Sequence, residues 1–161
     1  MRATRSVLAA FVLAVVLSGC GISIPTDPDG TLDRVRGGEL RVGVSPNPGF
    51  IEVGGGRPSG AEIDAIEAFA DHLDADIDWT VGSEEALVRA LEDERLDLVA
   101  GGLTDQTPWI DKAGVTRPYA EVTAEDGETH RLVMLVPLGE NAFLSDLETF
   151  LGGYIESEGL R

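Results

Sequence analysis

Groups able to hold a small ligand gather in residues 96–119. A short apolar run here leads to Gly102, Thr104 follows two residues later, and Thr107 stands directly before Pro108. This order is typical of a strand, a tight backbone turn and the first turn of a helix, and free backbone N–H groups converge at such a junction. We therefore expect Gly102, Thr104 and Thr107 to offer hydroxyl and backbone donors to a ligand.

Three further side chains extend this candidate ligand-binding site. Phe50, in the loop after the first expected strand, is either an aromatic wall for the ligand or a cover for the sheet edge. Trp109 is either an exposed contact residue or packing for a short helix expected from Pro108, and Thr107 has a second interpretation as the cap of that helix. Arg117 would add a cation from the neighbouring strand end.

No set of catalytic or metal-binding groups can be assembled from the spacing. His72 and His130 lack the histidine, cysteine or carboxylate neighbours of a metal site. Carboxylates are so frequent that choosing a pair for acid–base catalysis would be arbitrary. We therefore expect a protein that is not an enzyme and that uses neither a metal ion nor a cofactor.

The composition predicts one acidic globular domain. The 161 residues are 43% hydrophobic and 25% charged, the formal net charge is −17, and Lys112 is the only lysine. This length gives room for a single core. Because such a surface repels phosphates, we expect no nucleic acid partner.

The amino-terminal residues are typical of a bacterial export signal. Arg2 and Arg5 precede an apolar run over residues 7–17, and small residues then lead to Cys20, the only cysteine. The tetrapeptide at 17–20 resembles a lipobox, which implies cleavage after residue 19 and attachment of acyl chains to Cys20. We expect a signal peptide over residues 1–19, a flexible tether over 20–31 and one domain over 32–161.

Within that domain, the hydrophobic pattern alternates between periods of two and 3.6 residues. Strands are expected at 39–45, 77–81, 96–100 and 130–137, and helices at 61–73, from 83 and at 141–155. Ser59 and Glu62 have the spacing of a capping box at the start of the first helix. Alternating strands and helices of these lengths indicate an α/β fold with a mostly parallel sheet.

Several short motifs occur in the order found in the type 2 periplasmic solute-binding proteins. They are GELRVGV at 38–44, GAEID at 60–64, LVRALEDERLDLVA at 87–100, Gly102-Leu103-Thr104, Thr107-Pro108 and Arg117-Pro118-Tyr119. The chain resembles the first lobe of that family, which delivers amino acids and similar solutes to ABC importers. The resemblance implies a single-lobed three-layer domain with about five strands.

Two departures from the family pattern affect the expected site. The family inserts a second lobe after the Pro-Tyr segment, but only a short turn separates Tyr119 from His130 here. The amino-acid binders also carry a carboxylate-binding arginine three residues after the threonine that matches Thr107, where this chain has Ile110. The resemblance therefore implies a solute ledge at Phe50 and the 102–109 segment, without the family's closed pocket.

These observations lead to one leading functional hypothesis and one alternative. We expect a lipid-anchored solute-binding domain on the outer face of the cytoplasmic membrane or in the periplasm. It would be an accessory or minimal component of a transport system for a small polar solute such as an amino acid. The alternative is an interaction or regulatory lipoprotein that has lost solute binding and uses the exposed lobe face to dimerise or to dock on a membrane protein. The possible protein partners are thus a membrane transporter or a second copy of the chain.

Overall fold

A five-stranded mixed sheet forms the centre of the protein. The computed structural model describes residues 26–54, 57–123 and 127–158. The strand order is β4-β1-β5-β9-β6, with β1 parallel to β4 and β5, and β9 antiparallel to β5 and β6. The strands are β1 (Glu39–Val44), β4 (Asp76–Val81), β5 (Leu98–Ala100), β6 (Gly114–Val115) and β9 (Leu135–Val136).

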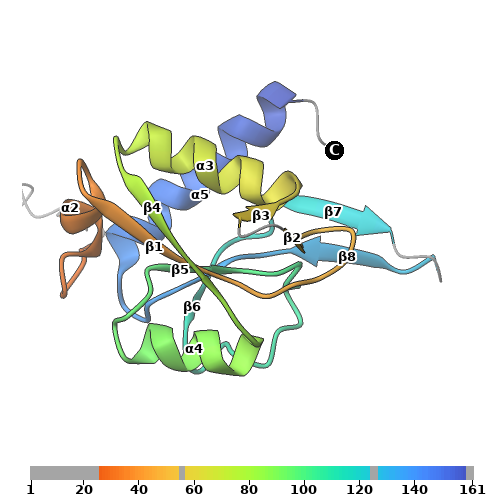
Figure 1. Cartoon of the computed structure of the whole chain (residues 1–161), viewed down its shortest axis with the longest axis horizontal. Helices are drawn as coiled ribbons and strands as arrows, with labels where there is room; N and C mark the ends of the chain where they lie inside the picture. The colour runs from red at the N-terminus through yellow and green to blue at the C-terminus, as the bar shows by residue number, and fades with distance from the viewer. Residues whose placement is uncertain (1–25, 55–56, 124–126, 159–161) are drawn as a thin grey trace, which may run out of the picture.

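Helices cover both faces of this sheet. The helices α3 (Ala61–His72) and α5 (Asn141–Glu158) lie on one face and α4 (Glu84–Glu92) on the other, with the short α2 (Thr31–Val35) beside the start of β1 (Figure 1). Two separate buried clusters correspond to these faces. On β5, Leu98 and Ala100 belong to the α3 and α5 cluster, whereas Val99 belongs to the α4 cluster, as the alternation of strand side chains requires. The predicted three-layer α/β domain is confirmed.

Two small antiparallel hairpins extend from the central sheet. The first pairs β2 (Glu52–Gly54) with β3 (Arg57–Ser59), and the second pairs β7 (Ala120–Thr123) with β8 (Thr129–Leu132). The β7–β8 hairpin directly follows Tyr119, the position after which the related proteins insert their second lobe.

The strand predicted over residues 130–137 is two strands. At Val133 and Met134 the chain leaves its pairing with β7 and enters the central sheet as β9. The N–H of Val133 donates to the Leu103 carbonyl (2.9 Å), and the N–H of Met134 donates to the Thr116 hydroxyl (2.9 Å). An apolar run cannot reveal this change because all of residues 132–136 are buried.

Two local predictions on helix starts are wrong. The helix expected from Pro108 is a single turn, in which the N–H groups of Lys112 and Ala113 donate to the Trp109 carbonyl, and β6 begins directly after it. The capping box is also absent, because Gly60 is the N-cap of α3, with a φ of 129° and no side-chain cap. The carboxylate of Glu62 is instead engaged elsewhere.

The residues before α2 are bonded to the start of α5. Oδ1 of Asp27 accepts the N–H groups of Ala142 (2.6 Å) and Phe143 (3.0 Å), and Glu140 accepts those of Asp29 and Thr31 (3.0 and 2.8 Å). The described end of the predicted tether is thus held to the domain.

The predicted signal peptide and Cys20 lie outside the described residues. None of the helices in the described parts of the chain is long and apolar enough to cross a membrane.

Candidate functional site

Three of the six predicted ligand-binding residues line one cleft. Phe50 comes from the loop after β1, and Gly102 and Thr104 come from the loop after β5. These loops meet because β1 and β5 are adjacent parallel strands whose carboxyl ends share one edge of the sheet. The cleft has a volume of about 330 Å³, and its other lining residues are Gly49, Val122, Thr123, His130 and Leu132. The β7–β8 hairpin therefore forms its second wall.

The loop after β5 can fit against Phe50 only with glycine at position 102. Gly102 has a φ of 65°, and a Cβ atom there would lie 2.5 Å from Nδ2 of Asn47 and 2.9 Å from the Phe50 ring. Asn47 also donates from Nδ2 to the carbonyl of Gly101 (2.9 Å). The two loops are consequently joined to each other, and the Phe50 ring packs on Gly102.

A buried carboxylate that the sequence argument missed lies behind this loop. Glu62 is 3% exposed; its Oε2 accepts the N–H of Gly102 (2.6 Å), and its Oε1 accepts the hydroxyl of Tyr119. The N–H predicted to serve a ligand is thus used within the protein. Burial raises the pKa of Glu62 above 4.5, although the hydrogen bonds from Tyr119 and Gly102 act against the rise. Burial and the charge of Glu62 raise the pKa of Tyr119 well above 10.

The surface of the cleft is mostly apolar. Its polar side chains are the hydroxyls of Thr104 and Thr123 and the imidazole of His130. The Thr104 hydroxyl also accepts the N–H of Gln106 at 3.4 Å. None of the lining residues is an arginine or lysine, and the nearby Arg131 is paired with Asp105. The cleft is therefore suited to an uncharged or apolar group with one or two hydrogen-bonding atoms.

Thr107 and Trp109 lie outside this cleft. Thr107 supports its own turn, since its N–H donates to the Thr104 carbonyl (2.9 Å) and its hydroxyl accepts the N–H of Trp109 (3.5 Å). Trp109 is half-buried against the α4 cluster and donates from Nε1 to Glu84 (3.3 Å). The bonds of Thr107 are therefore local, but the short helix that it was expected to cap is a single turn, and Trp109 packs on the α4 cluster instead.

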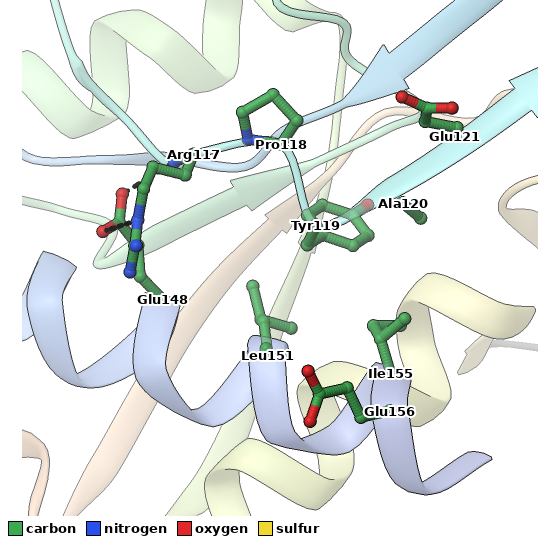
Figure 2. Close-up of a pocket in the computed structure, with 10 residues that line it drawn as sticks. Arg117, Pro118, Tyr119, Ala120, Glu121, Glu148, Leu151, Ile155 and Glu156 are labelled. Atoms are coloured by element: carbon green, nitrogen blue, oxygen red, sulfur yellow. Dashed lines mark hydrogen bonds and ion pairs between the residues drawn. The ribbon is translucent and has the colours of Figure 1, made fainter. Parts of the chain in front are cut away.

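Arg117 lies in a different hollow. Its backbone N–H and its Nε both donate to the carboxylate of Glu148 on α5, each at 2.7 Å (Figure 2). The hollow, a groove of about 520 Å³, runs between residues 117–121 and α5. The structure therefore does not bring Arg117 to Phe50 and Thr104. Within the described residues, no group of three or more histidine, cysteine or acidic side chains could hold a metal ion.

Comparison with known families decides the ancestry of the domain. The model of the bacterial extracellular solute-binding proteins, family 3, matches residues 40–158. The chain belongs to this family. It is therefore a solute-binding domain of family 3, and the description of that family assigns its members an extracellular place.

Solved structures with the same fold include a first domain of an arginine-binding protein and a solute receptor. A mutant of the arginine-bound domain 1 from TmArgBP has a TM-score of 0.68 at 20% identity, with 78% of this chain and 98% of that chain covered. The L-cystine solute receptor of Neisseria gonorrhoeae, in its unliganded open form, has a TM-score of 0.65 at 11% identity, with 80% and 92% covered. These similarities establish the fold of the first lobe.

Two curated relatives of this family 3 domain correct one expectation. Both are named membrane-bound lytic murein transglycosylase F. The protein of Aliivibrio fischeri is 30% identical over 105 residues, covering 64% of this chain and 21% of its own length. The protein of Yersinia enterocolitica is 28% identical over 130 residues, covering 76% and 27%. The chain thus spans about a quarter or less of their length.

The expectation that the protein is not an enzyme is contradicted, because both relatives carry the name of an enzyme. Reasoning from the residues of one chain could not detect this connection. The chain corresponds to 21% and 27% of those proteins, so a search of its own histidines and carboxylates tests only that part.

Proposed function

We propose that this family 3 domain binds a small solute in the cell envelope, as an accessory or minimal substrate-binding component of a transport system, and that acyl chains on Cys20 anchor it. The solute is a small molecule such as an amino acid, held through its less charged part in the cleft between Phe50 and Thr104. The observation that carries the proposal is the meeting of Phe50, Gly102 and Thr104 in one cleft at the carboxyl ends of β1 and β5.

The lining of the cleft narrows the class of solute. An α-carboxylate would need a cationic or multiple N–H partner, but the lining residues include no arginine or lysine, and the Gly102 N–H is taken by Glu62. An aromatic or aliphatic group could stack on Phe50 while Thr104 bonds one polar atom. We therefore expect solutes with a large apolar part to bind more tightly than glycine or glutamate.

The curated relatives support a second candidate class of solute. Their name links them to murein, so soluble fragments of murein belong in any panel of test ligands beside the amino acids. Such a fragment also carries uncharged groups that suit a cleft without cations.

Thermal unfolding of the full chain with each ligand tests the proposal. A solute at about 100 times its Kd stabilises the folded state by about 2.7 kcal/mol, which raises Tm by several degrees. Phe50→Ala should weaken binding by about tenfold or more and Thr104→Ala by about threefold to tenfold, through loss of an aromatic contact and of one hydrogen bond.

Thr149→Ala is the matched control, because Thr149 is exposed on α5 and bonds only the carbonyl of Ser145 in its own helix. If no solute raises Tm while light scattering reports a stable dimer, the alternative of an interaction lipoprotein replaces solute binding. Mass spectrometry of the membrane fraction tests the anchor, and an unmodified amino terminus at Met1 would remove it.

A further inference from the structure

The strand β7 has an open edge. It pairs with β8 alone, in a register that sets Ala120 opposite Leu132 and Val122 opposite His130. The other side of β8 is occupied by the loop after β5, since Asp105 donates its N–H to the carbonyl of residue 131 and residue 133 donates to Leu103. This side of the hairpin is therefore closed.

Alternation along the hairpin shows which groups face outward. Because the backbone groups of residues 131 and 133 point to the loop, those of 130 and 132 point to β7, where the Leu132 carbonyl accepts the N–H of Tyr119 (3.1 Å). In this register their opposite residues, Val122 and Ala120, point back toward β8. The N–H and C=O groups of Glu121 and Thr123 then point to the open edge. Across this edge the structure shows no backbone partner for them among the described residues. Unpaired strand edges of this kind accept an additional strand.

A groove runs beside this edge, between residues 117–121 and the second half of α5 (Figure 2). Its apolar lining comes from Pro118, Tyr119, Leu151 and Ile155. The groove and the solute cleft have no lining residue in common. The groove is therefore separate from the solute cleft, although Thr123 on the open edge of β7 also lines that cleft.

The charge of the groove is negative. Glu121, Glu148 and Glu156 line it together with Arg117, and Arg117 is neutralised by its two bonds to Glu148. Glu121 and Glu156 are exposed and form no ion pair in the described structure. Arg131 lies opposite Glu121 across the hairpin, but it is paired with Asp105. Two acidic side chains thus remain for an external cation.

We propose that β7 and this groove bind an extended, cationic segment of a partner protein. The segment adds to the open edge of β7 as a further strand, bonded to the backbone of Glu121 and Thr123. Its lysine or arginine side chains lie on the face toward the groove, where their methylene stems pack on Leu151 and Ile155 and their charged ends lie near Glu121 and Glu156. Strand addition supplies affinity through the main chain, and the alternating side chains supply specificity.

Charge argues against a second copy of the chain as the occupant. Pairing two β7 strands would bring together two acidic grooves on chains that each carry a formal net charge of −17. Like charges facing one another across an interface disfavour association. A basic partner avoids this repulsion.

Fluorescence anisotropy with the full chain in detergent tests the proposal. The probe is a labelled peptide of alternating lysine and valine. The first control peptide has glutamate in place of each lysine. The second control peptide keeps the lysines, but every second backbone nitrogen is methylated, so that one edge of the peptide strand has no N–H donors. We expect both controls to bind at least about tenfold more weakly, since one reverses the charge and the other loses the backbone bonds. Equal binding of either control would overturn the proposal.

A pair of charge reversals locates the binding surface. Glu121→Lys should weaken binding of the lysine peptide by about fivefold to tenfold. Asp78→Lys makes the same charge change on an exposed residue of β4 and should have a much smaller effect. If the two variants weaken peptide binding equally, only the overall charge of the protein matters, and the assignment of the binding site to β7 and the groove is wrong. A concentration-dependent dimer that the peptide does not dissociate would assign the β7 edge to a second copy instead.

Discussion

A buried carboxylate lies at each end of β5, Asp97 directly before the strand and Glu62 of α3 against the loop after it, and the two have opposite kinds of partner. Before the strand, Asp97 is fully buried and bonded to two arginines, with Nε and Nη2 of Arg41 at 3.0 and 2.6 Å and Arg34 at its other side. After the strand, Glu62 is 3% exposed and bonded only to neutral donors, the N–H of Gly102 and the hydroxyl of Tyr119. The carboxylate before β5 is thus ion-paired, whereas the carboxylate beside the ligand-facing end of β5 has only neutral hydrogen-bond donors.

The partners decide the charge that each carboxylate carries. Burial alone would raise the pKa of Asp97, but hydrogen bonds from Arg41 and Arg34 outweigh burial and lower that pKa. For Glu62 burial is the larger effect, and its pKa is raised. At the start of β5, Asp97 is therefore a stable anion, and its bonds to Arg34 and Arg41 connect α2, β1 and β5. The ligand-facing end holds a carboxylate that is easier to protonate, and it positions the loop of the cleft without a fixed cation.

Removal of the Asp97 carboxylate, at the start of β5, should give the largest loss in the free energy of unfolding. Asp97→Ala leaves Arg34 and Arg41 without their shared partner, and breaking a buried pair costs about 3 kcal/mol or more. Because the two arginine side chains are 42% and 27% exposed, water can solvate them, so we expect the lower end of that range. Urea unfolding measures the loss. The control Asp93→Ala breaks an exposed pair with Arg95 and should cost at most about 0.5 kcal/mol; equal losses would refute the special role of Asp97.

Removal of one neutral donor at the ligand-facing end should have a smaller effect. Tyr119→Phe deletes one of two hydrogen bonds to Glu62, and a hydrogen bond to a charged group contributes about 2 kcal/mol. Thr149→Ala, which removes an exposed hydroxyl bonded to the Ser145 carbonyl within α5, is the control and should change the free energy of unfolding much less. If the two variants unfold at the same urea concentration, Tyr119 does not stabilise the buried carboxylate.

The pH dependence of stability should have opposite signs at the two ends. The raised pKa of Glu62 means that the folded state holds its proton more tightly than the unfolded chain, so its contribution falls as pH rises above about 4.5. The pKa of Asp97 is lowered, and its contribution is lost as pH falls below about 3.8. Glu62→Gln removes the first effect and leaves the second.

Relative to wild type, Glu62→Gln should therefore gain stability on going from acid to neutral pH. The gain is about 1.4 kcal/mol for each pKa unit by which the folded-state value exceeds the unfolded one. Urea unfolding of both proteins across that range gives the difference directly. A difference that does not vary with pH would show that Glu62 has an ordinary pKa in the folded protein.

Sequence reasoning was most successful where structure follows from periodicity and strand order. The alternating runs placed the strands and helices of the first half, and adjacent parallel strands bring Phe50 and Gly102 to one edge. It was least successful for Glu62, which has the spacing of a local capping residue. Its partners Gly102 and Tyr119 are 40 and 57 residues away, and no local pattern reports them. Arg117 is similar, because Glu148, 31 residues later, accepts its backbone N–H and its Nε–H.

The smallest effect is expected at Trp109, which lies near the ligand-facing end but packs on α4. Trp109→Phe keeps an aromatic ring against the α4 cluster and loses only the 3.3 Å bond to Glu84. We expect a loss of about 0.5–1 kcal/mol in the free energy of unfolding and no change in solute affinity. Trp79→Phe, half-buried on β4, is the matched control for loss of an indole. A fall in solute affinity for Trp109→Phe alone would extend the binding surface beyond Phe50 and Thr104, because neither packing nor the bond to Glu84 requires Trp109 to contact a ligand.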